Sequence, residues 1–180
     1  MYAIVTSLDA DQDKQTRTIW NKLSDQCKLV GMEMFPLPHF SWQGAESYDL
    51  IKVKEVLGDF CQMIEPFQVI TAGLGLFTGN IPVLYISVVK NRQLLELHER
   101  LWSITKIHSA NRNLYYAPEE WIPHITVAYK DVTPEKLGCA VEDVLYTPIK
   151  FTVEVNSVSM VHAVGEDIGI DWKINFGRGE

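Results

Sequence analysis

Strand-like and helix-like segments alternate along all 180 residues of the chain, and no Gly/Ser/Pro-rich linker or run of like charges separates them. Short apolar runs predict strands near 1–8, 67–77, 83–89, 122–129, 151–164 and 168–176, and a further strand that begins near Pro36 and Pro38. Interleaved helices, a hairpin turn at Thr78-Gly79-Asn80 and a strand-rich end indicate an α+β fold. We expect one domain over residues 1–180.

Capping residues and apolar faces place four helices between these strands. Asp9 or Asp11 is expected to cap the first, Ser47 the second and Thr133 the fourth, where Pro134 takes the first helical position. The third helix is expected over about 92–104. The residues predicted to face inward are, helix by helix, Ile19, Trp20, Leu23 and Cys27; Ile51, Val56, Phe60, Met63 and Ile64; Leu94, Leu97, Leu101 and Trp102; and Leu137, Ala140, Val141, Val144 and Leu145.

Charge and hydropathy narrow the range of partners. Hydrophobic residues make up 47% of the sequence and charged residues 22%, as in a globular domain with a sizeable core. The formal net charge of -7 opposes binding of duplex DNA or long RNA, but leaves room for a small nucleotide or a single RNA end. No run approaches the roughly 20 apolar residues that span a bilayer. We expect a monomer that contacts neither duplex DNA nor a membrane.

The three cysteines, Cys27, Cys61 and Cys139, lie far apart in helix-like segments, and no Cys-x-x-Cys pair occurs. Their odd number and apolar neighbours favour buried free thiols. Free thiols in turn indicate a reducing compartment, so we expect a cytoplasmic protein.

Two five-residue segments share one pattern: Pro38-His39-Phe40-Ser41-Trp42 and Pro123-His124-Ile125-Thr126-Val127. Each contains proline, histidine, an apolar residue, a hydroxyl residue and a second apolar residue. Because residues i and i+2 of a strand point to one face, each histidine shares a face with its hydroxyl partner. One His-x-Ser/Thr match is common by chance, but two matches with the same proline and apolar positions are rare. The pair therefore predicts a site.

Two histidines and two hydroxyls suit the cleavage of a phosphodiester. One neutral and one protonated imidazole can take a proton from the attacking oxygen and give one to the leaving oxygen near neutral pH. The hydroxyls can donate to the non-bridging phosphate oxygens. The sequence has no His-Glu-x-x-His or clustered carboxylate–histidine set, so we expect no metal and no cofactor. The roles of base and acid stay open between His39 and His124.

The two motifs resemble those of the two-histidine (2H) phosphoesterase superfamily, which includes 2'-5' RNA ligase-like proteins and cyclic nucleotide phosphodiesterases. Residues 67–77 and 81–85 are similar to that family's middle hairpin, and Phe176-Gly177 to the end of its last strand. The resemblance implies a bilobal fold: two pseudo-symmetric antiparallel-sheet lobes with helices outside, each giving one motif strand to a central cleft. It also implies His39 and His124 as the catalytic pair, and Ser41 and Thr126 as the phosphate-binding residues.

The chain departs from the family pattern at two places. Ser41 replaces the commoner threonine, which preserves the hydroxyl. RNA ligase-like members often carry arginine five positions after the second histidine, where this chain has Tyr129. Strand alternation predicts that Lys130 shares a face with His124 and Thr126, so it could supply the charge, while Tyr129 could stack on a base. This departure favours a small cyclic phosphate over RNA-end ligation.

The expected function is hydrolysis of a 2',3'-cyclic phosphate or a similar small nucleotide-like ester. RNA 2'-5' ligation or RNA-end processing, a non-catalytic nucleotide-binding module and an interaction domain without a ligand are the alternatives. His98 and His162 are expected to be structural. His108 and Arg112 are expected in a polar loop, where Arg112 could reach a phosphate, although a solvated arginine is favoured. The aromatics Trp42, Tyr85, Trp121 and Tyr129 could line a base pocket, but core packing is expected for most of them.

Overall fold

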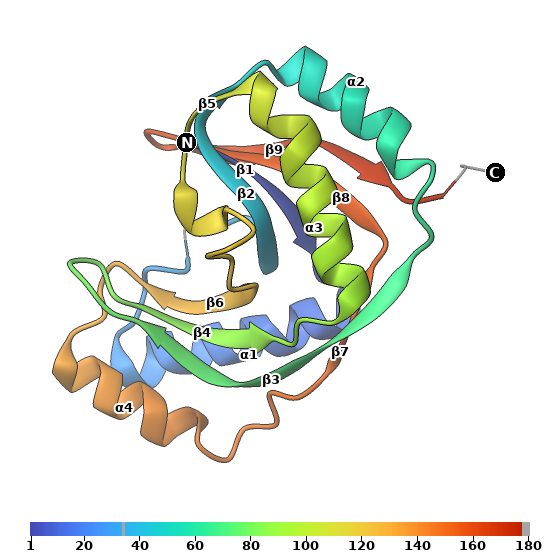
Figure 1. Ribbon diagram of the computed structural model, residues 1–180. Helices are drawn as coiled ribbons and strands as arrows, with labels where there is room; N and C mark the ends of the chain where they lie inside the picture. The colour runs from blue at the N-terminus through green and yellow to red at the C-terminus, as the bar shows by residue number, and fades with distance from the viewer. Residues whose placement is uncertain (34, 178–180) are drawn as a thin grey trace.

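A computed structural model describes residues 1–33 and 35–177 (Figure 1). The elements in chain order are β1 (Tyr2–Ser7), α1 (Ala10–Cys27), β2 (His39–Tyr48), α2 (Leu50–Cys61), β3 (Phe67–Phe77), β4 (Val83–Val88), α3 (Arg92–Thr105), a 3-10 turn (Lys106–His108), β5 (Ser109–Arg112), a second 3-10 turn (Leu114–Tyr116), β6 (His124–Tyr129), α4 (Pro134–Val144), β7 (Thr152–Val155), β8 (Ser157–Val164) and β9 (Asp167–Asn175). The predicted α+β class is confirmed.

The strands form one antiparallel sheet in the order β7-β3-β4-β6-β2-β1-β8-β9, with β5 paired to β2. Val155 ends β7 and Ser157 begins β8, so two strands at distant places in this order are separated by Asn156 alone. In a flat sheet, two strands so far apart in the order could not be joined by a single residue. The sheet therefore curls into a half-barrel, as Figure 1 shows.

The two strands that carry the predicted motifs meet at the centre of this sheet. β2 and β6 are antiparallel neighbours through one register pair, Phe40 with Ile125, whereas β1 and β2 pair over six residues. We call this short contact between β2 and β6 the seam. The sheet continues through β1, β8 and β9 on one side of the seam and through β4, β3 and β7 on the other. Whether the halves are pseudo-symmetric lobes stays a prediction.

The helices pack in two pairs. α1 packs against α4 and β6, while α2 packs against α3 and β9, and α3 also packs against β2. Each helix begins at a side-chain cap that accepts a backbone N–H, as helix starts require: Asp9, Asp49, Asn91 and Thr133. None of the described helices combines the length and apolar character needed to cross a membrane.

Several local predictions are wrong. The second helix is capped by Asp49, because β2 extends through the predicted cap Ser47 to Tyr48. Its buried residues are Val53, Leu57, Phe60 and Cys61, while Ile51 and Met63 are exposed. On α4, Ala140 and Val144 are buried, whereas Val141 and the following residue Leu145 are exposed. Only a narrow stripe of this short helix contacts the rest of the protein.

Two further segments differ from the sequence prediction. The single strand expected over 151–164 is two strands, because β7 pairs with β3 and β8 pairs with β1. The polar segment at 109–112, expected to be a loop, forms β5 and pairs with the end of β2. Neither long-range pairing leaves a mark in the local hydrophobic pattern.

The cysteine prediction is wrong for two of the three residues. Cys27 at the end of α1 and Cys139 in α4 form a disulfide, although 112 positions separate them. Cys61 is a free, buried thiol, and burial raises its pKa to about 12. The argument from free thiols to a reducing cytoplasm therefore loses its basis.

Candidate active site

His39 and His124 are the first residues of the two strands that meet at the seam. The residues that alternate with the motif side chains are buried: Phe40 and Trp42 on β2 and Ile125 and Val127 on β6 are at most 1% exposed. The motif histidines and hydroxyl residues are half-buried instead. The period-2 pattern thus holds in both motifs, and the apolar side of each strand anchors it in the core.

The seam places the two motifs opposite each other. Continuing the antiparallel register of Phe40 and Ile125 by one residue each way sets His39 across from Thr126 and Ser41 across from His124. The four side chains occupy the same side of β2 and β6, which we call the motif face. Each histidine thus has two hydroxyl neighbours, one along its own strand and one across the seam.

The two imidazoles are held in the same way. Nδ1 of His39 lies 2.9 Å from the carbonyl oxygen of Leu37, and Nδ1 of His124 lies 2.6 Å from that of Ile122. A carbonyl oxygen only accepts hydrogen bonds, so Nδ1 carries the proton in both rings. The Nε2 atom of a neutral ring is then a free base, and that of a protonated ring is a donor. In each ring, Nε2 is therefore the nitrogen that can accept or donate a proton.

Burial lowers the pKa of both histidines below the usual 6.5. For His39, the hydrogen bond to Leu37 works in the opposite direction, and the charge of His124 lowers the pKa further. For His124, the hydrogen bond to Ile122 raises the pKa and so opposes burial. Repulsion between the two charged rings disfavours protonation of both, so the state with one neutral and one positively charged imidazole forms first as the pH falls.

Aromatic side chains flank His124. The ring of Phe77 meets it edge-on at 4.8 Å between centroids, and the ring of Tyr85 lies at 5.0 Å. Phe77 and Tyr85 also stack on each other at 4.3 Å. Gly75 makes this possible, because a Cβ there would meet the Tyr85 ring at 2.3 Å. These contacts fix the imidazole and remove water from one side of it.

A β-bulge determines which residue follows Thr126 onto the motif face. The register between β4 and β6 shifts after the pairing of Tyr85 with Thr126, and Ala128 then pairs with Leu84. Val127 and Ala128 are both buried, so Tyr129 returns to the side of Thr126. Its ring lies 6.0 Å from that of Phe35, which in turn lies 6.4 Å from His39.

The predicted orientation of Lys130 assumes that the strand continues through this residue, but the strand ends before it. β6 ends at Tyr129, and Lys130 has a left-handed backbone with φ of 72°. Its Nζ atom lies 5.7 Å from the centroid of the Tyr129 ring. The predicted pair thus stays together at the end of β6, with the lysine against the tyrosine.

Tyr116 is a neighbour of the motif face that sequence reasoning missed. Burial raises its pKa, and a hydrogen bond with the Ser41 side chain opposes that shift. Gly44 gives the ring its space, since a Cβ there would lie 3.2 Å from it. Tyr116 ends a 3-10 turn in an irregular stretch, and such a stretch has no periodicity that could have revealed the contact.

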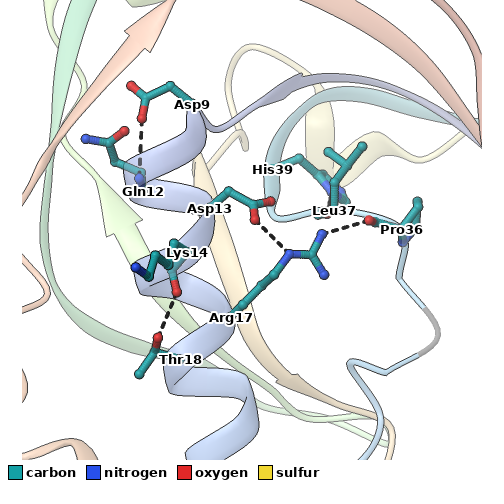
Figure 2. Close-up of polar contacts among 9 residues, drawn as sticks. All are labelled: Asp9, Gln12, Asp13, Lys14, Arg17, Thr18, Pro36, Leu37 and His39. Atoms are coloured by element: carbon teal, nitrogen blue, oxygen red, sulfur yellow. Dashed lines mark hydrogen bonds and ion pairs between the residues drawn. The ribbon is translucent and has the colours of Figure 1, made fainter.

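A side chain of α1 binds the backbone of the segment that leads into His39 (Figure 2). The Arg17 guanidinium donates to the Asp13 carboxylate at 2.7 Å and to the carbonyl oxygen of Pro36 at 2.9 Å. The next residue, Leu37, holds the ring of His39. Arg17 therefore fixes the backbone on which the orientation of the imidazole depends.

The remaining histidines and Arg112 lie apart from the motif face. Buried His98 binds the Trp42 carbonyl oxygen at 3.0 Å, and half-buried His162 contacts two aspartates on the β8–β9 hairpin. Arg112 donates to the carbonyl oxygen of Lys106 and lies over the Trp102 ring. Of the aromatics considered for a base pocket, Trp42, Tyr85 and Trp121 are buried, whereas Tyr129 is half-buried.

Residues 1–33 and 35–177 contain no group of three or more His, Cys, Asp or Glu side chains that could hold a metal ion. Two open hollows of ≈ 530 and ≈ 540 Å³ lie beside α4 and α2, and no motif residue lines either of them.

The fold is similar to that of Usb1 from Kluyveromyces marxianus, with a TM-score of 0.50, 10% sequence identity and 97% coverage of each chain. A structure of the same protein with uridine monophosphate gives a TM-score of 0.48 at 9% identity, covering 97% of this chain and 98% of that one. No curated protein sequence matches this chain. At such low identity, the first likeness shows a shared fold.

The family comparison covers much more than the motifs. The sequence matches the model of the 2'-5' RNA ligase superfamily over residues 14–167, a range that contains most of α1 and all elements from β2 through β8, both motif strands included. The match covers well over half of the chain, and the half-barrel has the corresponding fold. This protein belongs to the 2'-5' RNA ligase superfamily of two-histidine phosphoesterases.

Proposed function

We propose that this protein is a metal-independent phosphoesterase that hydrolyses a 2',3'-cyclic phosphate or a similar small nucleotide-like phosphodiester. His39 and His124 exchange protons with the attacking and leaving oxygens through Nε2. Ser41 and Thr126 donate hydrogen bonds to the non-bridging oxygens of the phosphate, whose charge is redistributed in the transition state. The roles of the histidines as base and acid are interchanged in the reverse reaction.

The matched tethering of the two imidazoles carries this proposal. Both Nδ1 atoms donate to the carbonyl oxygen two residues upstream, and both rings stand on the motif face beside hydroxyls of each strand. A binding site for phosphate needs donors, but it does not need two histidines fixed in one tautomer. A pair of acid/base catalysts needs that arrangement, because each must present the same nitrogen to the substrate.

The surroundings favour a small ester. The chain has a net charge of -7, so a long polyanion gains little from the surface as a whole. The rings of Tyr129 and Phe35 border the site beside His39 and offer an apolar surface to a base. A single RNA end is the second candidate substrate, favoured by the family match and by the cation of Lys130 beside Tyr129.

The test is hydrolysis of a panel of 2',3'-cyclic nucleotides in excess EDTA. We expect turnover by the wild type, and a loss of at least ~10²-fold in kcat for both His39→Ala and His124→Ala. His108→Ala is the matched control, because only the backbone carbonyl of His108 takes part in a described hydrogen bond. Its turnover is expected to equal that of the wild type.

The alternatives give different results. Cleavage or joining of RNA oligonucleotide ends without turnover of cyclic nucleotides would select the second candidate. Thermal stabilisation by nucleotides without any turnover would indicate a non-catalytic binding module. If nucleotides gave no turnover and no thermal stabilisation, the proposed chemistry would be rejected, and an interaction domain without a ligand would be the remaining alternative.

A further inference from the structure

Two tryptophans donate indole hydrogen bonds to the motif strands at matching positions. Nε1 of Trp20 lies 3.0 Å from the carbonyl oxygen of Thr126, and Nε1 of Trp121 lies 2.9 Å from the carbonyl oxygen of Ser41. The two acceptors are the hydroxyl residues of the two motifs. Trp20 comes from α1 and Trp121 from the segment before β6, so local sequence does not explain the match.

Both acceptor carbonyls lie next to the seam. β2 and β6 pair at Phe40 and Ile125, and an extended ladder would next pair Ser41 with His124 and His39 with Thr126. A buried carbonyl oxygen at the end of a ladder needs another donor. The indole N–H groups supply that donor on each side of the single pair. Each indole thus supplies a fixed donor to a motif-strand carbonyl oxygen just beyond the single register pair.

Packing holds both indoles firmly. Trp121 is completely buried and stacks on His98 at 3.7 Å and on Trp42 at 5.5 Å. Trp20 is 7% exposed, and the Arg17 guanidinium lies 5.7 Å from the centroid of its ring. The donors are thus fixed relative to the core and do not move freely with the strands.

We infer that Trp20 and Trp121 are paired positioning residues, which hold β2 and β6 apart beyond the seam and thereby set the spacing of His39 and His124. This inference rests on the proposed function, because spacing matters only if both histidines act on one phosphate. Displacement of a catalytic group by about 1 Å can cost roughly 10²-fold in rate. Loss of either indole donor should therefore act mainly on kcat.

The test replaces each tryptophan singly with 3-benzothienyl-alanine, in which sulfur takes the place of the N–H group and the shape is nearly kept. Trp172 provides the matched control, because its indole Nε1 is buried and has no hydrogen-bond partner among the described residues. We expect kcat to fall by ~10–10²-fold at Trp20 and at Trp121, with a much smaller change in KM. At Trp172 both constants should stay unchanged.

A second readout needs no substrate. The charge of His124 contributes to the pKa of His39, so a changed spacing should move the pKa of His39 in an NMR titration. If the wild type turns over no substrate, the proposed function fails, and this titration alone decides whether the indoles set the spacing. Unchanged pKa values in both analogues would overturn the inference.

A purely structural role would also be visible. It would lower the melting temperature of the Trp20 and Trp121 analogues while kcat and the histidine pKa values stayed at the wild-type level, and that result would overturn the inference. Trp20→Phe and Trp121→Phe serve as second variants if an analogue does not fold. They remove the same donor, and the same changes in kcat and pKa are expected.

Discussion

The pairing of Phe40 with Ile125, continued by one residue, sets Ser41 across the seam from His124, so the hydroxyl residue of one motif lies opposite the histidine of the other. The same register sets Thr126 across from His39. Each half of the proposed catalytic machinery therefore uses both strands, and neither motif forms a complete site by itself.

Removal of either hydroxyl should slow the reaction. We expect Ser41→Ala and Thr126→Ala each to lower kcat by roughly 10²-fold, because a donor to the phosphate oxygens is lost in the transition state. Ser41→Thr and Thr126→Ser keep the hydroxyl and should retain most of the activity. Steady-state kinetics on one cyclic nucleotide checks this, and equal rates for Thr126→Ala and Thr126→Ser would show that the hydroxyl has no such role.

Arg17 should affect activity although it lies behind the site. Arg17→Ala removes the bonds to Asp13 and Pro36, so the backbone that holds the His39 ring loosens. We expect a fall in kcat of about 3–10-fold and a small loss of stability, since the ion pair is partly exposed. The measurements are kcat and the melting temperature.

Arg92→Ala is the matched control for this variant. Arg92 pairs with Glu96 at the same i,i+4 spacing on α3, and the Arg92 side chain is 92% exposed. Its removal should leave kcat unchanged. An equal loss of activity in both variants would mean that Arg17 acts through general stability rather than through His39.

His98 should make the protein sensitive to acid. Burial lowers its pKa to about 4, while the unfolded chain titrates near 6.5. Between these values the unfolded state binds more protons, so the free energy of unfolding falls as the pH is lowered. The loss amounts to up to about 3 kcal/mol. Urea unfolding of wild type and His98→Gln at pH 7 and pH 4.5 should show a weaker pH dependence in the variant.

His162 offers a control of opposite sign. Asp171 and Asp167 raise its pKa, so its stabilising effect is present below the unfolded pKa and is lost as the pH rises through the folded pKa. His162→Gln should therefore steepen the loss of stability in acid. A pH dependence that is the same in wild type and His98→Gln would contradict the assignment to His98.

The disulfide can be tested without any assay of function. Alkylation of the unfolded, non-reduced protein should add one label, at Cys61, and reduction should raise the count to three. Cys27→Ser should lower the free energy of unfolding by about 2–4 kcal/mol, because the bridge closes a long loop. Three labels without reduction would restore the prediction of free thiols.

Local patterns predicted the elements well where they depend on neighbours in sequence. The Thr133-Pro134 start of α4 and the strand carrying Phe40 and Trp42 follow from capping and period-2 rules, and the structure confirms them. The α+β class followed from the same alternation. The placement of both motifs on strands was expected from the prolines and the apolar pattern, whereas the meeting of the two strands was expected only from the resemblance to the family.

Long-range geometry was beyond these rules. The disulfide joins Cys27 to a residue in another helix, and the break at Asn156 depends on which strands β7 and β8 pair with. The bulge beside Val127 moves Tyr129 to the motif face, a position that simple alternation gives to Lys130. Tertiary pairing determines all three features, and a single sequence does not encode it in any short window.

The central claim is that two histidines share acid and base roles, and the pH dependence of kcat/KM tests it most directly. Because burial lowers both pKa values, the account predicts a bell-shaped profile centred below pH 6.5 in the wild type. It also predicts the loss of one limb in His39→Gln and of the other limb in His124→Gln. A bell that persists unchanged in either variant, or a profile centred above pH 6.5, would contradict the account.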